Sequence, residues 1–244
     1  MKKIFSFIIT SLVIGNIISW VMGSWPIDFK RQAYNEQQFA SIKSLKQELV
    51  NNAEDISLLV ELGSTYSMHN DIDLADNYLA QAHNIAPNDA LVMAWYNANS
   101  AKVSGASLDF TMGFYKLYTL NKVLGNISKA VDLAPNDLTI RLIRLATFAN
   151  IGKINPNFDL VFNDEAWFNT LLKRAPKEIP EQVKGQFYIA MAQAYFFKAD
   201  TSSAQQVQNY LNLYQAVKTK APLDLTQYQN LEIQFSEQNR GELW

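Results

Sequence analysis

The chain has 244 residues, 48% of them hydrophobic and 18% charged, which allows one domain or two small ones with a buried core. Lysine and arginine number 21 against 23 for aspartate and glutamate, so the formal charge of −2 leaves no basic excess for a nucleic-acid backbone. With no cysteine and only two histidines, the composition excludes disulfides, thiolate metal sites, a cysteine nucleophile and a histidine-rich metal centre.

The N-terminal segment is typical of an export signal. Lys2 and Lys3 precede an apolar run over residues 4–22, and small residues before Ser24 suit cleavage there. The run also approaches the ~20 residues that a helix needs to span a bilayer, so a retained signal anchor competes with a cleaved signal peptide. We expect residues 1–24 to lie outside the fold. The rest of the chain is expected in the periplasm, or anchored to the membrane on its extracytoplasmic side through residues 4–22.

Downstream of Trp25 the apolar residues recur at spacings of three and four, with no sustained alternation of period two, so the chain is predicted to be all-α. Residues 25–55 are expected to form a leading helical segment, whose helix covers Phe39 to Leu49. Short oxygen side chains that can cap the start of a helix stand at Asp55, Asp73, Asp89, Asp137 and Ser202, the last with Gln205 as a capping box.

A recurring dipeptide divides the remainder. Ala-Pro ends each apolar pattern at intervals of 41 to 48 residues, and twice it lies within a similar pentapeptide, Ile85–Asp89 and Leu133–Asp137. Proline stops one helix and the following Asn-Asp caps the next. These marks predict a helical repeat domain over 56–240, with helix pairs at about 56–89, 90–136, 137–177 and 178–222 and a cap at 224–240.

The segment 56–89 resembles a tetratricopeptide repeat (TPR). The signature positions of that family fall on Leu59, Leu62, Gly63, Tyr66, Ala75, Leu79, Ala82 and Pro87. Gly63 and Ala75 allow two antiparallel helices to approach closely, and the large apolar residues fill the space between them. The resemblance implies a right-handed superhelical solenoid of antiparallel helix pairs, with degenerate, longer repeats and a C-terminal capping helix.

No motif for catalysis or metal binding is found. The acidic cluster around Asp71 fails as a calcium loop, because Asp76 stands where glycine is needed and Ala82 where a carboxylate is needed. His69 and His83 have no evident nucleophile, and the sequence holds neither Gly-x-Ser-x-Gly nor a phosphate loop. We expect a protein that is not an enzyme and uses no metal or cofactor.

Arg141 and Arg144 stand three residues apart and share a helix face. They either hold a carboxylate of a partner or close an internal ion pair, with Asp109 or Asp164 as candidates. The internal role is predicted for Arg144, and a surface contact for Arg141.

In the TPR family the first helix of each pair lines a concave groove. The resemblance implies a small-residue, mildly apolar and nearly uncharged lining, which suits a helix or an extended apolar peptide. Val60 and Ser64 replace the lysine and asparagine with which some members clamp acidic tails. Partner-binding residues are predicted at Val60, Ser64, Ser67, Met68, Ala94, Ala98, Lys102, Arg141, Leu142 and Ala146.

The leading hypothesis is an exported or membrane-anchored scaffold that binds a protein or peptide, and its oligomeric state stays open. Residues 45–87 are also similar to the periplasmic TPR domains that present apocytochrome c for haem attachment. A transporter-accessory or small-ligand-binding envelope protein is the alternative, and a purely structural envelope component is a third. A deep pocket lined by Tyr96, Lys116, Arg141 and Arg144 would favour a small ligand, and an open groove would favour a peptide.

Overall fold

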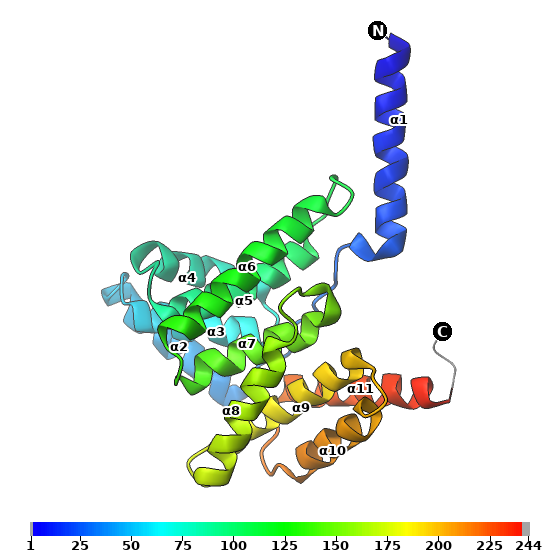
Figure 1. Ribbon diagram of the computed structural model, residues 1–244. Helices are drawn as coiled ribbons and strands as arrows, with labels where there is room; N and C mark the ends of the chain where they lie inside the picture. The colour runs from blue at the N-terminus through cyan, green and yellow to red at the C-terminus, as the bar shows by residue number, and fades with distance from the viewer. Residues whose placement is uncertain (1, 241–244) are drawn as a thin grey trace. The chain divides into compact units, whose positions relative to one another are not determined.

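The computed structural model of the protein describes residues 2–240, the side chains of residues 2, 3, 22 and 239 excepted. Within this range the chain forms eleven α-helices and no strand, so the all-α prediction is confirmed (Figure 1). The chain divides into two compact parts between Asn126 and Ile127, inside α6 (Phe114–Leu133). Each part is described by itself.

The first part begins with α1 (Lys2–Ser19), which extends away from the helices that follow (Figure 1). One wide turn, Trp20–Ser24, and an irregular stretch over 25–35 lead to α2 (Glu36–Asn51). Three further helices precede α6, namely α3 (Ile56–Met68), α4 (Ile72–Ile85) and α5 (Ala90–Ala106). No helix among residues 2–240 has both the length and the apolar character to cross a membrane.

Three of the predicted helix caps are present. The carboxylates of Asp55, Asp89 and Asp137 each accept a hydrogen bond from the N–H three residues ahead, at 3.1, 2.9 and 2.9 Å. Asp89 and Asp137 close the two related pentapeptides, so the repeated sequence has the same structural role in both places.

Two predicted caps are wrong. α4 begins at Ile72, so Asp73 lies inside its first turn instead of before it. Ser202 precedes α10 (Ser203–Ala216) but caps none of its amides, because its backbone is helical (φ −96°, ψ −13°) and not in the extended conformation of a capping residue. The predicted capping box of Ser202 with Gln205 therefore does not form.

In the first part, α3 packs on α2, α4 and α5, and α4 packs on α5. Leu62, Tyr66, Ala75 and Leu79 share one core cluster, and of the eight signature residues only Pro87, in the turn after α4, is exposed. A Cβ added at Gly63 would lie 2.5 Å from Leu79 Cγ, so the glycine is required for the close approach of α3 and α4.

The second part contains α7 (Leu138–Ile151), α8 (Leu160–Arg174), α9 (Glu181–Lys198), α10 and α11 (Pro222–Asn239). α7 packs on α8 and α9, and α9 packs on α10 and α11, around a core that includes Phe148, Phe168, Phe187, Met191 and Tyr214. In both parts adjacent helices pair along the chain, and this packing is consistent with a helical repeat.

Candidate functional site

The ten residues predicted to line a groove lie on α3, α5 and α7, and none of them is fully exposed. Val60, Ser67, Ala94, Ala98 and Leu142 are buried. Small side chains at several of these positions allow close packing, so they do not leave an open channel. The partly exposed residues are Ser64, Met68, Lys102, Arg141 and Ala146.

The structure brings two of the predicted residues together at the ends of α3 and α5. Lys102 Nζ donates to the Ser67 carbonyl oxygen at 2.7 Å and to Asn70 Oδ1 at 2.9 Å. Burial lowers the pKa of the Lys102 ammonium to about 8, because none of its partners is a carboxylate that would stabilise the charge. Lys102 therefore ties α5 to the end of α3.

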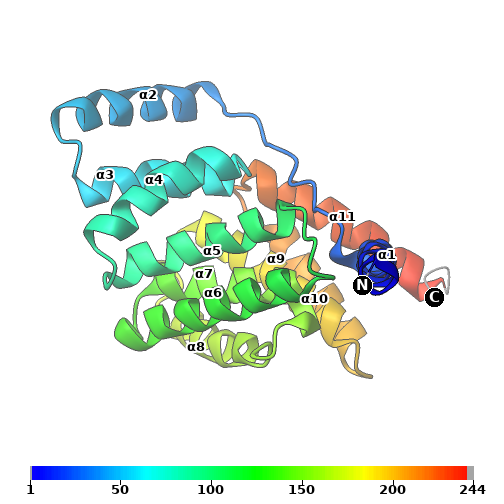
Figure 2. The same cartoon turned by 90° about the horizontal axis from the view of Figure 1, so that it is seen from above.

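An extended stretch of the chain, residues 25–35, lies across these same helix ends (Figure 2). The N–H of Ile27 donates to the Gly105 carbonyl at 3.0 Å, and the N–H of Gln32 donates to the His69 carbonyl at 2.8 Å. Main-chain bonds of this kind hold a peptide without depending on its side chains. The sequence predicted only a helical segment here, since residues 25–35 have no periodicity that would reveal their contacts.

Side chains of the same stretch add to its attachment. Arg31 Nη2 lies 2.8 Å from Asp71 Oδ1, and the Tyr34 ring packs 4.3 Å from the imidazole of His69, centroid to centroid. Burial, together with the nearby charge of Asp71, raises the pKa of Tyr34 to about 12. The acidic turn that failed as a calcium loop thus binds an arginine of this chain.

Arg141 and Arg144 both bind Asp164, whose side chain is fully buried on α8. Arg144 makes two hydrogen bonds, from Nε at 2.8 Å and from Nη2 at 2.7 Å, and Arg141 Nη1 makes one at 2.7 Å. The guanidinium of Arg141 also lies over the ring of Trp167, 4.9 Å from its centroid. The internal pair predicted for Arg144 is confirmed, whereas Arg141, for which a surface contact was expected, has the same internal partner.

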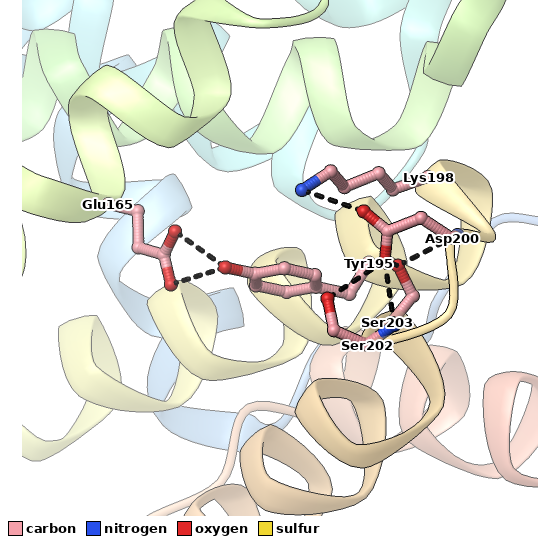
Figure 3. Close-up of polar contacts among 6 residues, drawn as sticks. All are labelled: Glu165, Tyr195, Lys198, Asp200, Ser202 and Ser203. Carbon is pink, nitrogen blue, oxygen red and sulfur yellow. Dashed lines mark hydrogen bonds and ion pairs between the residues drawn. The ribbon is translucent and has the colours of Figure 1, made fainter.

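A second polar cluster joins α8, α9 and α10, and Figure 3 shows its contact between Glu165 and Tyr195. The carboxylate of Glu165 accepts hydrogen bonds from the hydroxyls of Tyr195, at 3.0 and 3.1 Å, and Tyr210, at 2.6 Å. Burial, the largest effect, and the negative charge of Glu165 raise the pKa of both tyrosines, so both act as hydrogen-bond donors. The arrangement ties three helices together.

Beside it, Asp200 organises the turn between α9 and α10 (Figure 3). Its carboxylate accepts hydrogen bonds from Ser203 Oγ at 2.7 Å and Ser202 Oγ at 2.9 Å, and it pairs with Lys198 at 3.0 Å. Hydrogen bonds from Ser203 and Lys198 lower the pKa of Asp200, which makes it a poor base for activating either hydroxyl. The cluster is therefore suited to holding a turn.

Among residues 2–240, two of the open hollows lie one in each part of the chain. The first, about 380 Å³, is lined by Gly15, Ile18, Ser19, Ser24, Met112, Gly113, Phe114 and Leu117. The second, about 490 Å³, is lined by Gln206, Asn209, Tyr210, Asn212, Leu213 and Ala216 of α10.

Neither hollow includes a residue of the pocket that would favour a small ligand. Tyr96 stacks on His83 with 4.4 Å between ring centroids, and Lys116 Nζ donates to two carbonyl oxygens of its own chain, both at 3.0 Å. With both arginines bound to Asp164, all four residues of that pocket have partners inside the protein.

The chain matches no protein-family model, no curated protein and no solved structure. Its likeness to the TPR family therefore depends on its own residues.

Proposed function

We propose that the protein is a non-enzymatic scaffold of TPR type, acting on the extracytoplasmic side of a membrane, that binds an extended segment of a protein or peptide. One observation carries this proposal. The ends of α3 and α5 already hold an extended stretch, residues 25–35, through main-chain hydrogen bonds to Gly105 and His69. Residues 25–35 already use these two carbonyl oxygens, so they serve as the precedent for an extended segment on these helices, and a partner would bind beside them.

The TPR assignment, from which a right-handed solenoid would follow, is supported in its helix pairing by how the first pairs are built. α3 packs on α4, and both pack on α5, which is the order expected of consecutive repeats. Gly63 lies where the family needs a small residue between paired helices. The related turns before Asp89 and Asp137 start α5 and α7 with the same cap.

The partly exposed residues Ser64 and Met68 of α3 are the positions we assign to partner contact. The two residues lie one turn apart on the same face of α3, and neither side chain is charged. An uncharged lining favours an apolar or neutral segment over an acidic tail, because no lysine or arginine at these two positions can neutralise carboxylates.

Site-specific photocrosslinking in intact cells tests the proposal. A benzophenone amino acid placed at Ser64 or Met68 should give a discrete protein adduct, identified by mass spectrometry. The matched control is Gln81, an exposed residue of α4 that is not among the predicted partner contacts. Adducts from Gln81 alone, or unspecific adducts of equal intensity from all three positions, would contradict binding through α3. An apocytochrome c adduct would single out the haem-attachment class among TPR scaffolds.

A further inference from the structure

The loop between α5 and α6 and the first turn of α6 form an exposed aromatic surface. We name residues 108–118 the tip. Four aromatic side chains, Phe110, Phe114, Tyr115 and Tyr118, are 61–69% exposed, and Met112 and Leu117 add further exposed apolar surface. A concentration of exposed large apolar side chains of this kind marks an interaction surface.

The tip is fastened to the apolar helix α1 (Figure 1). The N–H of Met112 donates to Asn16 Oδ1 at 3.0 Å, and Trp20 Nε1 donates to the Asp109 carbonyl oxygen at 2.9 Å. The Trp20 ring also packs edge-on against Phe110, with centroids 5.9 Å apart. Since most apolar side chains of α1 are exposed, α1 and the tip present one continuous apolar surface.

The polar groups of the tip are bonded within the chain. The carboxylate of Asp109 accepts hydrogen bonds from the N–H and hydroxyl of Thr111, both at 2.6 Å, and from the N–H of Lys116 at 3.0 Å. Thr111 Oγ1 in turn accepts a hydrogen bond from the N–H of Tyr115 at 2.8 Å. Backbone groups that are paired in this way can lie next to lipid without an unsatisfied hydrogen bond.

Charge around this surface has the opposite sign to the chain as a whole. Of the seven basic residues in 1–31 and 101–126, Arg31 pairs with Asp71 and the ammonium of Lys102 is buried, which leaves five lysines against two aspartates, although the complete chain has a net charge of −2. Basic residues next to an apolar segment favour anionic lipid headgroups. Tryptophan and tyrosine are enriched where a protein meets the membrane–water interface.

We infer that the tip and α1 together form a lipid-binding surface that lies in the interfacial region of an anionic bilayer. The sequence placed only residues 4–22 at a membrane, and the structure adds a second segment about ninety residues later. The open hollow between Ile18, Met112 and Leu117 lies within this surface. This inference does not depend on peptide binding, so either can fail alone.

The absence of cysteine allows a unique probe to be introduced. We would label Phe114→Cys with an environment-sensitive nitrobenzoxadiazole dye in the full chain, reconstituted into vesicles of phosphatidylcholine and phosphatidylglycerol. Phe39→Cys, on α2, is the matched control, because Phe39 is 66% exposed and Phe114 is 69% exposed. Tyr118→Cys, one turn further along α6, provides a second probe of the tip.

The expected result is a blue shift at Phe114 and Tyr118, with quenching by nitroxide-labelled lipid several-fold stronger than at Phe39 and weak quenching by aqueous iodide. Equal iodide quenching at all three positions would overturn the inference. Protection of Phe114 from iodide without quenching by lipid would overturn it as well, because a protein would then cover the tip. Lipid quenching at Phe39 equal to that at Phe114 would show that the tip is not a distinct membrane contact.

Discussion

Gly63 sets the distance between α3 and α4, and its replacement by alanine should destabilise the protein. The added Cβ would lie 2.5 Å from Leu79 Cγ and 2.7 Å from Cδ2, where about 3.4 Å or more is normal. Overpacking of a core costs about 1–3 kcal/mol, whereas a Gly-to-Ala change inside a helix otherwise gains about 1 kcal/mol. The net loss should therefore be about 1 kcal/mol, because Leu79 is fully buried and cannot move away freely.

The same substitution at Gly125 is the control. Gly125 lies inside α6, and no atom comes within 4 Å of a Cβ added there. Gly125→Ala should stabilise the protein by about 0.5–1 kcal/mol, measured by urea unfolding followed by far-UV circular dichroism. In a Leu79→Ala background, where the obstructing side chain is absent, Gly63→Ala should become neutral or favourable. If Gly63→Ala stabilises the protein as much as Gly125→Ala does, our account of the α3–α4 contact is wrong.

The remaining predictions concern buried charges. Arg144→Ala should lower the free energy of unfolding by about 3–5 kcal/mol, and Arg141→Ala should lower it by about 1 kcal/mol. The difference arises because Asp164 loses two hydrogen bonds in the first variant and one in the second. Equal losses in urea unfolding would refute this. Burial lowers the pKa of Lys102 to about 8 from 10.5. Between pH 8 and 10.5 the lysine is therefore protonated in the unfolded chain and neutral in the folded protein, so the free energy of unfolding should rise with pH across this range, by up to about 3 kcal/mol. Lys102→Met should abolish that rise, and a rise that persists in the variant would exclude Lys102 as its source. Burial raises the pKa of Asp224 to about 7 from 3.8, so the stability that Asp224 contributes below pH 3.8 should be lost as the pH rises through 7. Asp224→Asn should remove this pH dependence from the melting temperature. A variant with the same pH profile as the original protein would contradict this prediction.

The helices could be predicted from the sequence because their signals are local. Asp89 and Asp137 cap the helices that begin directly after them, each by accepting a hydrogen bond from the N–H three residues ahead. Leu59, Leu62 and Tyr66 recur at the spacing of one helix face. Ser202 has the residue type of a cap, but its backbone has a helical conformation, and its hydroxyl donates to Asp200 instead of accepting from an amide of α10. Local pattern therefore identifies the helices and misjudges ends that depend on the backbone conformation of a single residue.

The contacts of residues 25–35 and of the tip could not be predicted in this way. Asn16 bonds to Met112 and Lys116 bonds to Ser24, pairs of residues that lie more than ninety positions apart and belong to no repeat. The shared partner of Arg141 and Arg144 could be predicted only in part, because Asp109 and Asp164 were equally suitable in the sequence. Asp109 in fact binds Thr111 and Lys116 close by.

Binding of an extended segment is the central claim, and isothermal titration calorimetry measures it most directly. The partner stretch crosslinked from Ser64 or Met68 would be synthesised as a peptide and titrated into the purified full chain. Our account predicts one binding site per chain, lost in Met68→Glu and kept in Gln81→Glu, since the first change places an unpaired charge on the proposed contact surface. Binding that both variants retain, or a crosslinked peptide that does not bind the purified chain, would contradict it.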